Sequence, residues 1–394
     1  MVSTWQNSFA QLQGFIKDNP SAEITENCIS IPSDVRPEFY RLFDAVRTDF
    51  LKDNFPSSLE KGYELSRGFA KVYQEAIAAS GLESIGVRAS LNWFLQDPVN
   101  GLMRSLFDPL FNLIRGKLSE QAFTDSTIKL IDDTFSAYFR EGYERWVVLG
   151  LMSRLQPDKN YMAFSRDFHT DSEISESSNT PGLREEVLDA IKETNKIEFS
   201  VTSISTFIVP RVLVHSQSLG RYASILTDFT EAYWRARNKS ENMEWFNIKS
   251  LAEEFGRSRL WPDMLLYASD TLEDIGLIAD YVWVARPDII VEIEESDGWY
   301  ERGGLELARR HIAALKPRYG CYILCRNAPP DAAYAEIMTK PASDQGSDGQ
   351  VLDGSEAVVV QDTLEPDIHI ITTGYDFTAL DAVVEALKKG IPAG

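Results

Sequence analysis

The first part of the chain carries apolar residues at intervals of three and four positions, the spacing that places them on one face of an amphipathic helix. This spacing is sustained over about residues 36–155, and seven aromatic residues within it are expected to form a core. These seven are Phe94, Phe107, Phe111, Phe135, Tyr138, Phe139 and Trp146. The pattern predicts an all-helical domain over residues 1–165.

Residues 166–183 interrupt this pattern. They are rich in Ser, Thr, Asp and Glu, contain little apolar material and include a Thr-Pro-Gly step at Thr180. Such composition is typical of an exposed connection between folded parts. We therefore predict a linker over residues 166–183.

Residues 184–394 alternate short β-branched runs with helical segments. The predicted strands cover residues 207–214, 281–284, 289–293, 322–324, 358–360 and 368–372. The predicted helices cover residues 219–237, 248–255, 301–315, 332–338 and 378–389. This alternation predicts a mixed α/β domain, and the fold class expected for the whole chain is α+β.

The charge of the chain is strongly and unevenly acidic. Its 394 residues include 60 Asp plus Glu and 39 Lys plus Arg, a net charge of −21 with His neutral. Residues 251–394 alone hold 26 acids and 12 bases, a net charge of −14. Because duplex binding depends on Lys and Arg that neutralise phosphates, any nucleic-acid partner would have to meet a local basic surface.

The start of the chain differs from a secretory signal, which combines a basic beginning with an apolar core. The first twenty residues are polar throughout, and their first basic residue is Lys17. The least charged stretch, residues 199–220, contains Arg211 and seven Ser or Thr, too polar for a membrane-spanning helix. We expect a cytoplasmic protein with no membrane partner.

Several common catalytic motifs are missing from the sequence. It has no GxSxG, P-loop, GxGxxG or HExxH pattern. Its four histidines are scattered, which argues against a hydrolytic triad or a multi-histidine metal site. Each of them, His169, His215, His311 and His369, is expected to be structural or exposed.

Three acids gather in residues 279–297, which we interpret as two strands joined by a turn at residues 286–288. If Val282 faces Glu292 in this hairpin, then Asp280 faces Glu294. Side chains alternate along a strand, so these three carboxylates would share a face within ~5–8 Å. Mg²⁺ could relieve their repulsion. The alternative is a half-exposed strand whose acids merely keep one side in water.

The same segment resembles the PD-(D/E)xK nuclease superfamily, which has the restriction-endonuclease-like fold. That family carries an Asp on one strand and (D/E)xK on the next, antiparallel strand, followed by a helix and another strand. Asp280 matches the first acid and Glu292 the second, while Glu294 occupies the Lys position. A minority of restriction enzymes in the superfamily have such an ExE version.

The resemblance extends over residues 261–328, because a predicted helix over 301–315 and a strand over 319–326 follow in the matching order. Asp263 is the alternative first acid if residues 271–279 are an insertion. The α/β domain is therefore expected to resemble the restriction-endonuclease-like fold.

The resemblance implies a Mg²⁺- or Mn²⁺-dependent nuclease, active or degenerate, with Asp280 and Glu292 as metal ligands. Glu294 would accept the proton of the attacking water or bind a second ion. The substrate phosphate would meet the bases of the following helix, which are Arg302, Arg309, Arg310 and Lys316. The N-terminal helices would contact nucleic acid or a second subunit of a homodimer. Alternatively, the four bases simply solvate an exposed helix face.

Two other interpretations remain. A non-enzymatic interaction protein would use the acidic α/β domain to bind a basic partner. Residues 370–374, Ile-Ile-Thr-Thr-Gly before the last predicted helix, would suit a phosphate-binding turn at a helix N-terminus.

Overall fold

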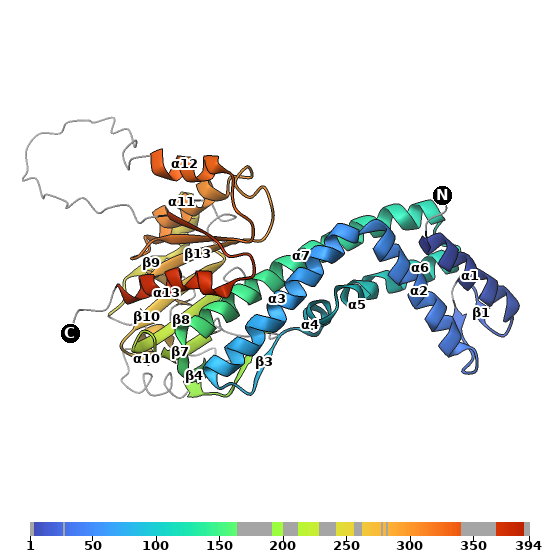
Figure 1. Cartoon of the computed structure of the whole chain (residues 1–394), viewed down its shortest axis with the longest axis horizontal. Helices are drawn as coiled ribbons and strands as arrows, with labels where there is room; N and C mark the ends of the chain where they lie inside the picture. The colour runs from blue at the N-terminus through green and yellow to red at the C-terminus, as the bar shows by residue number, and fades with distance from the viewer. Residues whose placement is uncertain are drawn as a thin grey trace, which may run out of the picture. The chain divides into compact units, whose positions relative to one another are not determined.

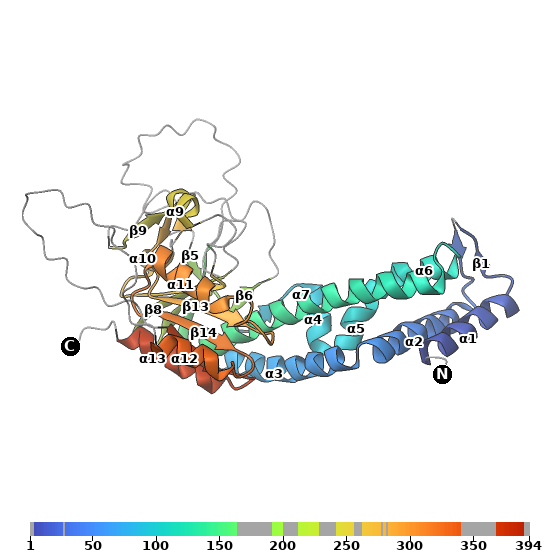
Figure 2. The ribbon, with the colours of Figure 1, turned by 90° about the horizontal axis from the view of Figure 1, so that it is seen from above.

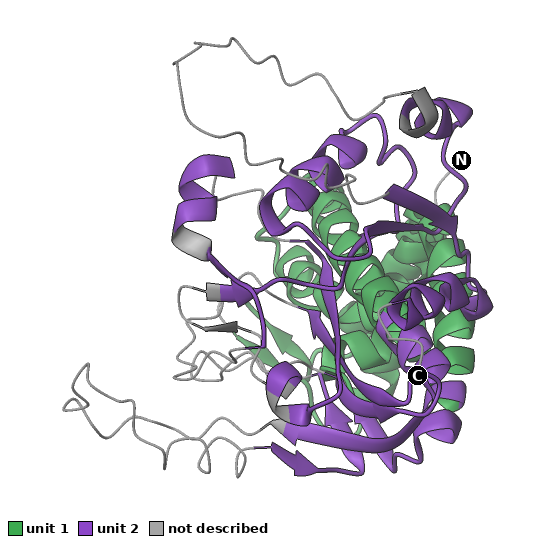
Figure 3. Cartoon of the chain, turned by 90° about the vertical axis from the view of Figure 1, so that its left-hand side faces the viewer, with its two compact units in different colours: residues 1–74, 86–147 green, residues 75–85, 148–394 purple. Residues whose placement is uncertain are grey.

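The computed structural model combines a helical N-terminal region with a large mixed sheet, an α+β fold (Figure 1). It describes residues 4–26, 28–163, 191–199, 212–227, 242–255, 262–276, 279–280, 283–339 and 368–389. Two compact units divide the chain: unit 1 comprises residues 1–74 and 86–147, and unit 2 comprises residues 75–85 and 148–394 (Figure 3). None of the helices in the described ranges has the length and apolar character that a membrane crossing demands.

Unit 1 is built from amphipathic helices. They are α1 (Thr4–Asp18), α2 (Arg36–Asn54), most of α3 (Pro56–Ser80), α4 (Ala89–Gln96), α5 (Pro98–Met103), α6 (Phe107–Ile114) and most of α7 (Glu120–Leu155), with a hairpin of β1 (Glu23–Ile24) and β2 (Ile29–Ser30). The Trp5 ring lies 5.5 Å from the Phe50 ring and 5.6 Å from the Phe123 ring. The N-terminal region is mainly helical, as predicted, but it is not all-helical, because β1, β2, β3 (Ser84–Gly86) and β4 (Pro157–Ala163) lie within residues 1–165. Phe107 is 39% exposed and lies at the margin of the core, with its ring 4.8 Å from that of Phe111.

An eight-stranded sheet forms the centre of unit 2. In pairing order its strands are β15 (Ile368–Thr372), β14 (Cys321–Cys325), β13 (Ile289–Glu294), β10 (Met264–Ser269), β8 (Arg221–Thr227), β7 (Val212–Ser216), β4 (Pro157–Ala163) and β5 (Ile191–Glu193). The first three strands of this order are parallel, and the other neighbours are antiparallel. Helix α11 (Gly304–Leu315) connects β13 to β14, as a parallel pair requires a crossover.

Helices cover both faces of this sheet near β13 and β14. Figure 2 shows α11 on one side of these strands and α13 (Asp381–Lys388) on the other. Leu305 and Ala308 of α11 share a buried cluster with Ile290 and Ile323 of the sheet. The remaining described elements are β3 (Ser84–Gly86), the 3-10 helix η1 (Arg104–Leu106), β6 (Lys196–Glu198), β9 (Trp245–Asn247), α9 (Ile248–Phe255), α10 (Leu272–Gly276), β11 (Ala279–Asp280), β12 (Trp283–Ala285), α12 (Asp331–Thr339) and the 3-10 helix η3 (Phe377–Leu380).

The division of the chain differs from the predicted boundary after residue 165. The end of α7 belongs to unit 2, where the Leu155 carbonyl accepts hydrogen bonds from the hydroxyls of Ser216 and Ser218. Arg154 also forms an ion pair with Asp381 of α13. Because the helical pattern continues through both units, apolar spacing could not locate the division. The predicted linker, residues 166–183, lies outside the described residues.

Most predicted elements of the α/β part are confirmed where the structure describes them. The exception is the predicted helix over residues 219–237, which is wrong over residues 221–227 because these form β8. A short apolar run fits a buried strand as well as a helix, and here the pairing of β8 with both β7 and β10 decides. Residues 228–237, residues 207–211 of the predicted strand over 207–214, and the predicted strand over 358–360 lie outside the described residues.

Candidate acidic site

The predicted hairpin between Asp280 and Glu294 is wrong. Strand β13, which carries Glu292 and Glu294, pairs with β10 and β14. Asp280 ends β11, which pairs with β12 in a separate three-stranded sheet completed by β9. The turn at residues 286–288 therefore joins two strands of different sheets, and Asp280 is not a cross-strand neighbour of Glu292 or Glu294.

Asp263 is the acid beside Glu292. It directly precedes β10, whose first residue Met264 pairs with Val291, so one further step of the antiparallel register puts Asp263 opposite Glu292. The Asp263 Oδ2 atom accepts a hydrogen bond of 2.8 Å from the backbone N–H of Ile293. Asp263, the alternative considered in the sequence, is thus the aspartate that the fold brings to β13, and residues 270–288 lie between β10 and β13 in the chain.

The physical reason lies in burial. All six residues of β10 are buried, a pattern typical of a strand in the middle of a covered sheet. Strand β11 has only two residues and lies at the edge of its small sheet. Pairing with β10 places Ile290 of β13 in one buried cluster with Leu265 of β10 and Ile323 of β14, and such burial favours this partner.

Glu292 is buried and bonded to a histidine on α11. Its residue is 5% exposed, and its Oε1 atom lies 2.5 Å from Nδ1 of His311, which is 1% exposed. His311 lies three residues after Ala308 and four before Leu315, both buried, so it occupies the face of α11 that packs on the sheet. Sequence reasoning missed this residue, although its place in that helical period marks it as buried.

Glu294 ends β13 in a crowded, partly buried position. Burial, together with the nearby carboxylates of Asp263, Glu295 and Glu292, raises the pKa of its carboxyl group to about 8, while Arg302 opposes the shift. A Cβ atom added to Gly304, the first residue of α11, would lie 3.0 Å from Glu294 Oε1 and 2.6 Å from a ring carbon of Trp299. Glycine at this position thus permits α11 to begin directly beside the acid.

Of the four predicted phosphate-binding bases, Arg302 lies at the acidic end of α11. Its guanidinium donates to the Asp297 carbonyl at 3.0 Å and to the Ser296 hydroxyl at 2.5 Å. The other three extend along the helix: Arg309 is ion-paired with Glu336 of α12 at 2.6 Å, Arg310 follows it, and Lys316 stands just after the end. Because α11 is about 18 Å long, the four bases do not form one cluster around the acids.

A second guanidinium at this end was not predicted. Arg326 follows β14, and the parallel register puts its neighbour Cys325 beside Glu294. It is 8% exposed, and its Nε donates to the Glu295 carbonyl at 2.9 Å. This hydrogen bond holds the segment that directly follows β13. The sequence signal for Arg326 is its position directly after a buried strand that runs parallel to β13.

The turn over residues 370–374 lies at the same end of the strands as Arg326. The Gly374 N–H donates to the Arg326 carbonyl at 3.1 Å. The helical turn that follows is capped by an acid, however, because the Asp376 carboxylate accepts a hydrogen bond from the Thr378 N–H at 3.0 Å. This negative charge occupies the position that the predicted phosphate-binding turn would offer to an anion.

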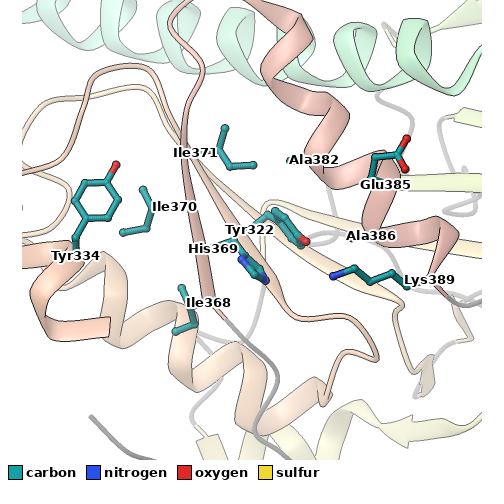
Figure 4. Close-up of a pocket in the computed structure, with 10 residues that line it drawn as sticks. All are labelled: Tyr322, Tyr334, Ile368, His369, Ile370, Ile371, Ala382, Glu385, Ala386 and Lys389. Atoms are coloured by element: carbon teal, nitrogen blue, oxygen red, sulfur yellow. The ribbon is translucent and has the colours of Figure 1, made fainter. Parts of the chain in front are cut away.

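A cavity of about 480 Å³ lies elsewhere in unit 2, at the β14 and β15 edge of the sheet (Figure 4). It is lined by Tyr322, Tyr334, Ile368, His369, Ile370, Ile371, Ala382, Glu385, Ala386 and Lys389. The Tyr322 and His369 rings stack with centroids 4.6 Å apart. The acids of β13 are not among the lining residues, so the cavity and the acidic site are separate features.

Within the described ranges, no three side chains of His, Cys, Asp or Glu are arranged so that they could hold a metal ion by themselves. The acidic site therefore consists of Asp263 beside Glu292, with Glu294 two residues further along β13. Comparison of the chain with protein families, with curated proteins and with solved structures finds no match.

Proposed function

We propose that the chain is a metal-dependent nuclease whose α/β domain is of the restriction-endonuclease type, with Asp263 as its first acid. The observation that carries the proposal is the hydrogen bond from the Ile293 N–H to Asp263, which holds this acid beside Glu292. The order that follows also supports it. An antiparallel strand with Glu292 and Glu294, then α11, then the parallel strand β14 is the order of the superfamily that the sequence resembles.

The donor chemistry of these acids suits Mg²⁺ or Mn²⁺. Both ions prefer oxygen ligands, and Mg²⁺ commonly takes only one or two protein carboxylates because it keeps water and binds substrate phosphates. Asp263 and Glu292 supply such a pair, so a third protein ligand is not needed. A cation would also relieve the repulsion that acts on Glu294.

Glu294 serves as the proton acceptor in this proposal. It stands where the superfamily has Lys, and strand alternation puts it on the same face of β13 as Glu292. A bound metal would polarise the phosphate and lower the pKa of the attacking water. The Glu294 carboxylate would take the proton that this water loses.

Arg302 is the base that would orient the scissile phosphate. It is exposed, it acts electrostatically on Glu294, and its own contacts to Ser296 and Asp297 hold it at this end of α11. Arg309 already has Glu336 as its partner, and Lys316 lies at the far end of the helix. A guanidinium suits this role because it binds phosphate oxygens in a bidentate manner.

The experiment compares Asp263→Asn and Glu292→Gln with Asp280→Asn as the matched control. Full-length protein is incubated with single- and double-stranded DNA and RNA in Mg²⁺, in Mn²⁺ and in a chelator. We expect metal-dependent cleavage that falls at least about 100-fold in Asp263→Asn and Glu292→Gln, since each removes a metal ligand. Asp280→Asn should stay within about twofold of the parent chain.

Two results would contradict the proposal. A wild-type protein that cleaves no substrate and gains no thermal stability from either metal would leave the interaction protein as the better interpretation. An Asp280→Asn variant as inactive as Asp263→Asn would show that the wrong aspartate has been assigned.

A further inference from the structure

The contact between His311 and Glu292 joins two elements that meet at the acidic site. Helix α11 contributes His311 and strand β13 contributes Glu292, with 2.5 Å between Nδ1 and Oε1. Both residues are at least nine-tenths buried. An ionised Glu292, the form that binds a cation, has only acceptor oxygens, so in that form the imidazole donates its hydrogen from Nδ1.

This hydrogen bond does more than satisfy a buried group. Without a donor, a buried carboxylate oxygen would pay the desolvation cost of an unmade hydrogen bond. With the donor fixed on a helix, rotation of the Glu292 carboxylate is restricted before any cation binds. Carboxylate ligands of metals are commonly held by such outer partners, and the loss of one weakens metal binding ~10–100-fold.

We infer that His311 is a positioning residue that orients the Glu292 carboxylate for a divalent cation. The inference rests on the proposed function, because it assigns Glu292 as a metal ligand. His311 itself is not assigned as a ligand, since its Nδ1 atom is committed to Glu292. It acts through the carboxylate that it holds.

A purely structural histidine would behave differently from a positioning residue. A structural role requires only that His311 fill its place under α11, so any loss of packing on this face would have the same consequence. A positioning role requires a hydrogen-bond donor at the location of Nδ1. The amide nitrogen of Asn overlies that location, whereas the amide nitrogen of Gln reaches further and Leu offers no donor.

The test measures Mn²⁺ affinity by titration calorimetry on the full chain without substrate, so it does not depend on catalysis. The variants are His311→Asn, His311→Gln and His311→Leu, with Ile312→Ala as the control for lost packing on the same helix. We expect Kd to rise at least 10-fold in His311→Leu and His311→Gln, and to stay within about threefold of wild type in His311→Asn and Ile312→Ala. His311→Gln retains a polar side chain if His311→Leu fails to fold.

The possible outcomes test the positioning role of His311 and the proposed function separately. Wild-type affinity in both His311→Leu and His311→Gln would overturn the positioning role and leave the proposed function standing. An equal loss in Ile312→Ala, or no rescue by His311→Asn, would also overturn it in favour of plain packing. Absence of Mn²⁺ binding by the wild-type chain would overturn the proposed function, and this inference with it.

Discussion

Two regions of unit 2 each offer an aspartate to the acids of β13, and only one of them reaches the strand. Asp263 begins the β10 region, in which six buried residues pair with β8 on one side and β13 on the other. Asp280 belongs to the β11–β12 region, a short pair in another sheet. The acid nearer to Glu292 in the sequence is therefore not the one on the strand that pairs with β13.

The largest effect should separate the contributions of β10 and β12 to the one buried cluster that they share. Leu265 of β10 is 1% exposed and lies between Leu226 and Ile290. Leu265→Ala should lower the free energy of unfolding by about 2–5 kcal/mol, the usual cost of a cavity in a packed core. Val284→Ala in β12, also 1% exposed, should cost about 1–2 kcal/mol because it removes fewer carbon atoms than Leu265→Ala.

Urea unfolding followed by tryptophan fluorescence measures both variants. An equal or larger loss for Val284→Ala would mean that the small sheet, rather than β10, supports the core next to β13.

A second comparison concerns Gly304, which lies beside Glu294 at the end of β13. An added Cβ would come within 2.6 Å of the Trp299 ring and 3.0 Å of the Trp299 carbonyl. Gly304→Ala should therefore lower the free energy of unfolding by about 1–3 kcal/mol, as overpacking does. Glu306→Ala, an exposed change in the same turn of α11, should stay within about 0.5 kcal/mol. Thermal unfolding of the two variants checks this, and equal melting temperatures would contradict the close approach.

The smallest effect concerns pH. The pKa of Glu294 is about 8 in the folded chain and near 4.5 when unfolded, so the folded state retains a proton between these values that the unfolded state has lost. The contribution of Glu294 to stability should fall as pH rises from 4.5 to 8 and level off above 8. At pH 8 Glu294→Gln should be more stable than wild type by about 1–2 kcal/mol, less than the full shift allows because the carboxyl keeps some solvent.

Glu244 supplies the control, because it lies beside the other region and pairs with Arg286 at 2.9 Å on the surface. Glu244→Gln should change stability by less than about 1 kcal/mol. Urea unfolding between pH 5 and pH 9 measures the difference from wild type at each pH. A difference for Glu294→Gln that does not grow between pH 5 and pH 8 would contradict the raised pKa.

The elements of the fold were predictable wherever their pattern is local. The helices of unit 1 follow from apolar spacing, and α11 and β14 follow in the predicted order. The cap of η3 by Asp376 also follows from the sequence, because a short acceptor side chain before a helical turn accepts its N–H. These features depend on residues within a turn or two of one another.

The site was only partly predictable because its geometry depends on long-range pairing. Glu292 and Glu294 were identified from strand alternation, whereas the choice between Asp263 and Asp280 required the partner of β13 to be known. His311 reaches Glu292 because α11 packs on the sheet, and Arg326 lies near the end of β13 because β14 pairs with β13 in parallel. A local sequence pattern shows neither the helix packing nor the strand pairing. For the same reason, the residues of β8 were predicted to be helical.

The central claim is that Asp263 and Glu292, rather than Asp280, provide the cation site of this chain. The most direct measurement is anomalous diffraction from crystals of the full chain grown with Mn²⁺. The account predicts an anomalous peak within coordinating distance of the carboxylates of Asp263 and Glu292, beside Glu294. A peak at Asp280, or no peak near β13 at a saturating Mn²⁺ concentration, would contradict it.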